Sequence, residues 1–255
     1  GHHAFNVRTR VRLPVGPSVD LAINTTSFHQ CPEGIRTMEN KLSEYEISIQ
    51  ICFLEIVTKI LKHEKDRFVT EYGSSYKSEP HITVYLDRYT QEGLPQLLHD
   101  LQELRVQPFS FSLLKPKARR EEDRRRNLYV MDVSNKKQIQ ELHTKVSQIA
   151  TRYRSPLLRS KVRQRLEQQG IHTDGTRESL KNVPEAEKFD PHVTLGDVYF
   201  DDVQPDLVSV RNNLKELEGK EIAVSNLVVF FYGKAESDEK FTLIEKVSIP
   251  LSQDL

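Results

Sequence analysis

Two short stretches of matching sequence constrain this chain more than any other feature. Residues 80–84 read Pro-His-Ile-Thr-Val, and residues 191–195 read Pro-His-Val-Thr-Leu. Both stretches contain β-branched residues, which favour an extended strand. Because successive side chains of a strand point to opposite faces, the histidine and threonine of each stretch share one face and the apolar residues share the other. Each stretch therefore predicts a strand that presents an imidazole beside a hydroxyl.

The repetition of this pattern indicates a functional site. A single His-x-Thr tripeptide arises easily by chance, and a lone histidine beside a strand is more often structural. Two copies in matched contexts favour a shared site that contains His81, Thr83, His192 and Thr194.

Strand alternation adds two further residues to the predicted site. Tyr85 has the parity of His81, and Gly196 has the parity of His192. We therefore predict that Tyr85 and Gly196 line the substrate site. A tyrosine packed in the core and a bulge at the glycine are the alternatives.

The elements around the two stretches recur in one order, which predicts the fold. Each His-x-Thr strand is followed by an amphipathic helix and then by two strands. The first set is expected at 81–87, 94–104, 109–114 and 128–133, and the second at 192–195, 205–217, 222–232 and 241–249. Duplicated strand-helix-strand-strand units predict a bilobal α+β fold with pseudo-two-fold symmetry, in which the two histidines face each other across a central cleft.

Residues 36–71 admit two interpretations. Ile47, Ile49 and Ile51 alternate as in a half-buried strand, and the apolar residues from Leu54 to Phe68 then follow helical spacing. The same residues also fit one long helix over 36–71. We favour a strand followed by a helix, because a helix of that length is far above the usual 11–12 residues.

The N-terminal part is predicted to lie outside the main domain. Residues 1–43 form an N-terminal extension, in which 5–13 alternate as a strand with a basic face and 14–33 are loop. The chain begins Gly-His-His, so residues 1–3 are interpreted as a tag remnant. Residues 44–255 form the main domain, with a basic insertion at 154–190.

Composition excludes several classes of protein. Lys plus Arg and Asp plus Glu both number 37, so net charge alone indicates neither a nucleic-acid nor a membrane partner. The only cysteines, Cys31 and Cys52, exclude a disulfide-rich scaffold and a multi-cysteine zinc site. No long apolar run or apolar signal core is present. We expect an intracellular protein, cytoplasmic or nuclear, that is monomeric and has no metal or cofactor.

Two basic segments bear on the size of the substrate. Residues 115–126 mix basic and acidic side chains and are interpreted as a charged hairpin loop. Residues 152–165 contain no acidic residue, and they are predicted to hold an RNA backbone through Arg159, Lys161, Arg163 and Arg165. A solvated surface loop is the alternative for both segments.

The paired motifs resemble those of the 2H phosphoesterase superfamily, over roughly residues 45–249. The resemblance rests on the four motif residues and on the order of elements. It implies that His81 and His192 are catalytic and that Thr83 and Thr194 bind phosphate. Some relatives carry a basic residue just after the second motif, where this chain has glycine and aspartate at 196–197.

The residue types also suit metal-free phosphodiester chemistry. Such a reaction needs a base and an acid together, and histidine, with an ordinary pKa of about 6.5, can supply both near neutral pH. Threonine hydroxyls on rigid strands supply hydrogen bonds to phosphoryl oxygens. We expect a metal-independent phosphodiesterase for RNA or nucleotides, with 2′,3′-cyclic phosphate ends as the leading substrate. The sequence leaves open which histidine is the base.

Four other functions stay open. The same residues would serve a 2′,5′-oligoadenylate phosphodiesterase or an enzyme that trims RNA 3′ ends. A non-catalytic module that binds nucleotide or RNA would keep the fold, and the N-terminal extension would suit an interaction domain.

Overall fold

The computed structural model describes residues 42–168, 170–178, 189–235 and 241–251. The predicted strand at 5–13 and the predicted loop at 14–33 lie outside the described residues.

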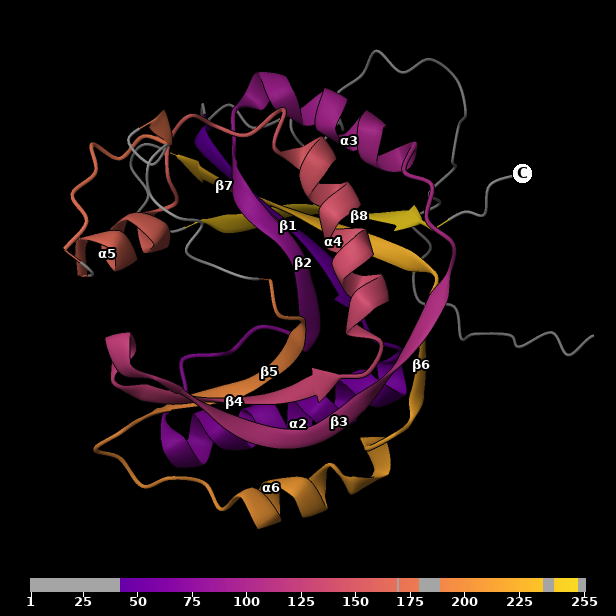
Figure 1. Cartoon of the computed structure of the whole chain (residues 1–255), viewed down its shortest axis with the longest axis vertical. Helices are drawn as coiled ribbons and strands as arrows, with labels where there is room; N and C mark the ends of the chain where they lie inside the picture. Colours follow the sequence, from indigo (N-terminus) through magenta and orange to yellow (C-terminus); the bar gives the residue numbers. More distant parts are fainter. Residues whose placement is uncertain (1–41, 169, 179–188, 236–240, 252–255) are drawn as a thin grey trace, which may run out of the picture.

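Two four-stranded antiparallel sheets form the framework (Figure 1). The first sheet has the order β2-β1-β7-β8, and the second has the order β5-β4-β3-β6. The strands of the first are β2 His81–Tyr89, β1 Leu42–Cys52, β7 Asn226–Ala235 and β8 Thr242–Pro250, and those of the second are β5 His192–Tyr199, β4 Arg126–Val133, β3 Phe109–Glu121 and β6 Glu221–Val224. The two His-x-Thr strands are thus edge strands, one in each sheet, and they contact each other. The predicted α+β class is confirmed.

Strand β1 and helix α2, Glu55–Tyr72, settle the two interpretations of residues 36–71. Ile47, Ile49 and Ile51 are fully buried on one face of β1, as a half-buried strand requires. Helix α2 ends at Gly73, which adopts the left-handed conformation with φ of 68°. The strand followed by a helix is confirmed, and the single long helix is wrong.

Each duplicated unit contributes strands to both sheets, and a helix that connects strands of one sheet can pack on the other sheet. Helix α2 connects β1 to β2 of the first sheet but packs on β5 of the second, whereas α4, Lys136–Ala150, connects β4 to β5 and packs on β2 (Figure 1). Likewise, the hairpin β3-β4 joins β5, and β7-β8 lie in the sheet of β2. Both units run from a His-x-Thr strand through a helix to further strands, two in the first unit and three in the second, and no unit forms a lobe from its own strands alone.

Two predicted boundaries need correction. Residues 115–121 continue β3 instead of forming a loop, because Lys117 and Arg119 stand in register opposite Val130 and Leu128 of β4. The turn itself comprises only Glu122–Arg124 and the left-handed Arg125. The strand predicted at 222–232 is divided between β6 and β7, which lie in different sheets.

The remaining helices lie close to their predicted places. Helix α3 is Leu94–Gln102 and carries a proline in its first turn, and α6 is Leu207–Asn213. Within the predicted insertion, α5 is Ser160–Gln168. None of the helices in the described ranges combines the length and the apolar character that crossing a membrane would need.

Candidate active site

The register of the edge strands places each histidine with its threonine on one face. His81 stands opposite Cys52 and Thr83 opposite Gln50, which both point away from the Ile47–Ile51 core face. In the second sheet, His192 stands opposite Asp132 and Thr194 opposite Val130. The apolar residues of the motifs, Ile82, Val84, Val193 and Leu195, are fully buried on the other face.

A backbone carbonyl two residues upstream holds the His81 ring. Nδ1 of His81 lies 2.7 Å from the carbonyl oxygen of Glu79. Since a carbonyl only accepts, Nδ1 carries the proton and donates it. Nε2 of the ring, 3.1 Å from Oγ1 of Thr83, is therefore the nitrogen that can exchange a proton with a substrate.

His192 is held in the matching way. Its Nδ1 lies 2.7 Å from the carbonyl oxygen of Asp190, so this nitrogen also donates and Nε2 is again the exchangeable one. Nη1 of Arg119 lies 3.2 Å from the same Nδ1. Because both groups are then donors, Arg119 acts on the ring as a neighbouring positive charge, not as a hydrogen-bond partner.

Burial lowers the pKa of both histidines below the ordinary value. For His81, the positive charges of Lys65 and His192 lower the pKa further, while the hydrogen bond to the Glu79 carbonyl raises it. For His192, the charge of Arg119 also lowers the pKa, but the hydrogen bond to Asp190 and the carboxylates of Asp190 and Asp132 raise it. The strands that carry the two rings, β2 and β5, contact each other.

A cluster of charges surrounds His192. Nη2 of Arg119 forms an ion pair of 2.7 Å with Oδ2 of Asp190 and a second ion pair with Asp132. Lys117 pairs with Asp132, and Nζ of Lys136 lies 2.7 Å from Oδ1 of Asp190. Lys117 and Arg119 were predicted to lie in a charged hairpin loop, and Asp132 was not predicted to belong to the site. The alternation of basic residues along 115–119 was the signal for a strand face.

Lys65 of α2 is a second charged group beside the motif strands that was not predicted from the sequence. Its side chain is buried, with 3% of the residue exposed, and Nζ donates to the carbonyl oxygen of Thr194 over 3.1 Å. Burial lowers its pKa to about 8. The signal was its helical spacing from the buried Leu61 and Phe68, which places position 65 on the face that packs on β5.

Bulges displace the two residues that were predicted to line the site. In each edge strand the register shifts directly after the threonine, so that Tyr85 stands opposite the core residue Ile49 and Gly196 opposite Tyr129. The ring of Tyr85 lies beside His143 of α4, with ring centroids 6.3 Å apart. Alternation fails at these bulges, and both residues lie on the face opposite the histidines.

The glycine is required by a close approach of α2. A Cβ atom built on Gly196 would lie 2.5 Å from Cδ1 of Phe68, a side chain that is fully buried. Gly196 therefore allows contact between helix and strand, and it does not open room for a ligand.

Acidic residues from elsewhere in the chain pair with the arginines of the basic segment. Arg159 lies 3.1 Å from Glu46, Arg163 lies 2.8 Å from Glu167, and Arg165 lies 3.4 Å from Asp123, each measured between Nε and a carboxylate oxygen. Lys161 belongs to α5, and the structure does not describe its side chain. The charge imbalance in the sequence of this segment is thus partly compensated in space.

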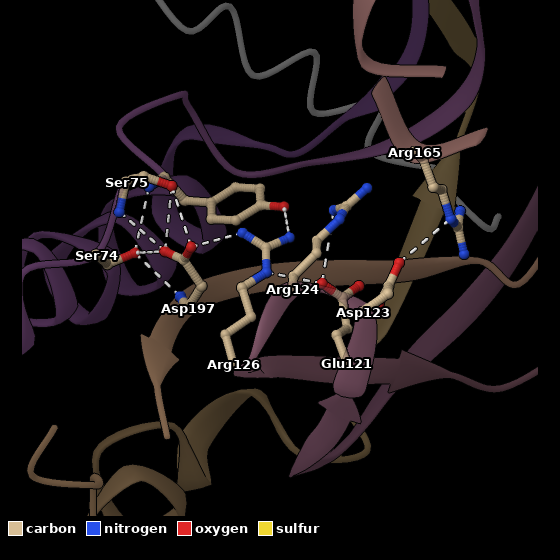
Figure 2. Close-up of polar contacts among 9 residues, drawn as sticks. Ser74, Ser75, Glu121, Asp123, Arg124, Arg126, Arg165 and Asp197 are labelled. Carbon is tan, nitrogen blue, oxygen red and sulfur yellow. Dashed lines mark hydrogen bonds and ion pairs between the residues drawn. The ribbon is translucent and has the colours of Figure 1, made fainter. Parts of the chain in front are cut away.

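Asp197 ties the loop after α2 to strand β5 (Figure 2). Its carboxylate accepts hydrogen bonds from Oγ of Ser74 at 2.8 Å, from N of Ser75 at 2.9 Å and from Nη1 of Arg126 at 2.6 Å. Burial would raise the pKa of Asp197, but these three donors outweigh it and hold the pKa below its ordinary value. Arg126 also pairs with Glu121 of the β3-β4 hairpin at 2.7 Å. Asp197 is therefore part of the scaffold that fixes the site.

Metal-ligating residues do not gather anywhere in the described part of the chain. No group of three or more His, Cys, Asp or Glu side chains there could hold a metal ion.

Two matched histidine–threonine pairs thus lie on edge strands that contact each other. The chain belongs to the 2′-5′ RNA ligase superfamily, whose family model matches residues 62–234. This confirms the resemblance to the 2H phosphoesterases. A comparison with curated proteins gave no significant match.

Solved structures with a similar arrangement have low sequence identity. LigT of E. coli in complex with phosphate is 12% identical with a TM-score of 0.48, covering 81% of this chain and 98% of that chain. TT0787 of Thermus thermophilus is 14% identical with a TM-score of 0.47, covering 82% and 100%. Usb1 of Kluyveromyces marxianus with uridine monophosphate is 10% identical with a TM-score of 0.39, covering 81% and 98%.

Proposed function

We propose that the chain is a metal-independent phosphodiesterase that acts on RNA or nucleotides, with 2′,3′-cyclic phosphate ends as the leading substrate. The observation that carries the proposal is the matched anchoring of His81 and His192. Each ring donates from Nδ1 to a carbonyl 2.7 Å away, which leaves Nε2 to exchange protons on the strand face that also carries the threonine of the motif. A binding module needs no such pair of oriented titratable rings.

The proposed reaction uses both rings in one displacement at phosphorus. One imidazole takes a proton from water at Nε2 while the water oxygen bonds to phosphorus. The bond from phosphorus to one ring oxygen of the cyclic phosphate breaks, and the other imidazole gives its Nε2 proton to that oxygen. If the 3′ oxygen leaves, the product carries a 2′-phosphate. Thr83 and Thr194 donate hydrogen bonds to the phosphoryl oxygens.

The same displacement would cleave 2′,5′-oligoadenylate or trim RNA 3′ ends, so substrate choice needs a direct comparison. We would measure turnover of a 2′,3′-cyclic nucleotide, a cyclic-phosphate-ended RNA and 2′,5′-oligoadenylate, each with EDTA present. We expect turnover that EDTA does not reduce, fastest on a cyclic phosphate. Loss of all activity in EDTA would refute the metal-independent mechanism.

Variants of the two histidines test the mechanism. His81→Ala and His192→Ala should each reduce kcat by about 10²–10⁴-fold, the usual contribution of a proton-transfer group. The control is His99→Ala, which alters an exposed histidine on α3 and should leave kcat unchanged. Near wild-type kcat in either of the first two variants would contradict the proposal.

A further inference from the structure

Each His-x-Thr strand bulges directly after its threonine. The pairing of β2 with β1 skips Val84, the residue after Thr83. The pairing of β5 with β4 skips Leu195, the residue after Thr194. A bulge interrupts the ladder of backbone hydrogen bonds at the skipped residue. Because Val84 and Leu195 are fully buried, the backbone carbonyls beside them need donors from outside the ladder.

A side chain of α2 supplies such a donor to the bulge in β5. Nζ of Lys65 donates to the carbonyl oxygen of Thr194 over 3.1 Å, and only 3% of this lysine is exposed. The carbonyl belongs to the peptide bond that joins the threonine to the bulge. The close approach of α2 to β5 that Gly196 allows brings the lysine within reach of this carbonyl.

A side chain of α4 supplies the matching donor to the bulge in β2. Nδ1 of His143 lies 2.7 Å from the carbonyl oxygen of Val84, and it carries the proton because a carbonyl only accepts. Nε2 of the same ring lies 3.4 Å from Oγ of Ser147, which can donate to it. The ring also stacks on that of Phe189, with centroids 3.9 Å apart and an angle of 2° between the planes. These contacts hold the imidazole as a donor against the bulge.

The two contacts occupy equivalent places in the duplicated fold. Helix α2 packs on β5 and helix α4 packs on β2, and each helix sends one polar side chain to the bulge that follows the threonine. One donor is an ammonium and the other is an imidazole. The same contact made by different residue types indicates that the bulge is the feature that needs a donor.

We propose that Lys65 and His143 are positioning residues, each of which holds the bulge after one motif threonine and thereby aims the hydroxyl of that threonine at the substrate. The inference rests on the proposed function, in which Thr83 and Thr194 donate to phosphoryl oxygens. Bulges beside active sites set the direction of neighbouring side chains. Without its donor the peptide bond at the bulge can turn, and the hydroxyl then turns with it.

Amide hydrogen exchange measured by NMR tests the inference without any substrate. His143→Phe keeps a flat ring that can stack on Phe189 but removes the donor. We expect the amides of residues 83–85 to exchange about tenfold faster in this variant, while those of 194–196 keep the wild-type rate. Lys65→Met should accelerate exchange at 194–196 and not at 83–85, so each variant is the control for the other. Equal acceleration at both bulges, or at neither, would overturn the inference.

Three further variants separate the donor from packing and from surface charge. His143→Asn keeps an N–H donor near the position of Nδ1, and Lys65→Arg keeps a cationic donor, so both should retain slow exchange at the bulge that they contact. Lys59→Met removes an exposed lysine of α2 that pairs with Glu55, and it should change neither bulge. If a variant without the donor does not fold by circular dichroism, the conservative variant decides. Wild-type exchange in it supports the inference, and faster exchange overturns it.

A double-mutant cycle provides the readout in the working enzyme. His143→Phe should lower kcat about tenfold, because displacing a donor costs part of the 10²–10³-fold that its removal costs. In a Thr83→Val background, which lacks the hydroxyl, His143→Phe should cause no further loss, whereas in a Thr194→Val background the tenfold loss should remain. Lys65→Met should show the opposite pattern.

The outcomes of the cycle separate the inference from the proposed function. Losses of the same size in both threonine backgrounds would show that the two side chains act on folding in general, and would overturn the inference. Absence of turnover on every phosphodiester would refute the proposed function, yet hydrogen exchange would still decide whether Lys65 and His143 hold the two bulges.

Discussion

Replacing Gly196 by alanine should destabilise the contact between α2 and β5. The new Cβ would lie 2.5 Å from Cδ1 and 2.7 Å from Cβ and Cγ of Phe68. Carbon atoms pack at about 3.5–4.0 Å, so helix and strand must separate by about 1 Å. Phe68 cannot turn away, because it is fully buried and its ring packs on those of Tyr129 and Tyr72, with centroids 5.1 and 5.6 Å away.

The size of the effect follows from two opposing contributions. Overpacking a closed core costs about 1–3 kcal/mol. Alanine restricts the unfolded chain more than glycine does, which returns about 0.4–1 kcal/mol. The overlap is severe, so we expect a net loss of about 2 kcal/mol in the free energy of unfolding. For a chain of this size that loss lowers Tm by roughly 4–8 °C.

Urea unfolding followed by circular dichroism measures this loss, since the chain has no tryptophan for fluorescence. The matched control is Gly73→Ala, where φ is +68° and no atom lies within 4 Å of the built Cβ. That variant should lose about 1 kcal/mol through backbone strain alone. Only Gly196→Ala should also lower kcat, because displacing β5 weakens the Lys65 contact to Thr194. Wild-type or higher stability of Gly196→Ala would refute the steric reasoning.

Three further substitutions give measurable outcomes. Arg126→Met leaves the Asp197 carboxylate buried without its cation and should cost about 3–5 kcal/mol at pH 7 by urea unfolding. The pKa of Asp197 is lower in the folded chain than in the unfolded chain, so the ion pair with Arg126 stabilises folding above the unfolded pKa of about 4. This contribution is lost as the pH falls through the folded pKa. An equal cost of Arg126→Met at pH 7 and pH 2 would contradict the role of the Asp197 carboxylate. Arg119→Met should raise the pKa of His192 in the NMR titration, since it removes a neighbouring charge and releases Asp190 and Asp132; an unchanged or lower pKa would count against this account. If the basic segment binds RNA, Arg163→Ala should reduce the slope of log affinity against log salt by about 0.7, the value for one single-strand phosphate, and an identical slope would argue against that contact.

Hydrophobic periodicity predicted the strands and helices that carry the motif residues, because periodicity depends only on residues within one segment. The apolar alternation of β1 and the helical spacing in α2 were sufficient to locate both elements. The histidine and threonine of each motif share a face, as strand geometry requires. Sheet membership was not predictable in this way, because it depends on contacts between segments far apart in the chain.

The failures have equally specific causes. A bulge changes the parity of a strand by one residue. Gly196 left a bulge in β5 as an open alternative, but nothing in the sequence around Val84 marks the bulge in β2. Residues 115–121 appeared too charged for a strand, yet Lys117 and Arg119 are accommodated because Asp132 of the neighbouring strand pairs with both. The counterions of Arg159 and Arg165 likewise come from residues more than 40 positions away.

Helix α2 packs on β5 and helix α4 packs on β2, so neither half of the chain contains all the elements that its own strands need for packing. A cut in the turn before α4 would leave one fragment with β1 to β4 and another with α4 and β5 to β8, and each fragment would hold two incomplete sheets. Each fragment would also lack the helix that covers its own His-x-Thr strand. We therefore expect neither fragment to fold or react alone, and activity to return only when the two are mixed. Unfolding should be one cooperative transition, because loss of either sheet uncovers the other.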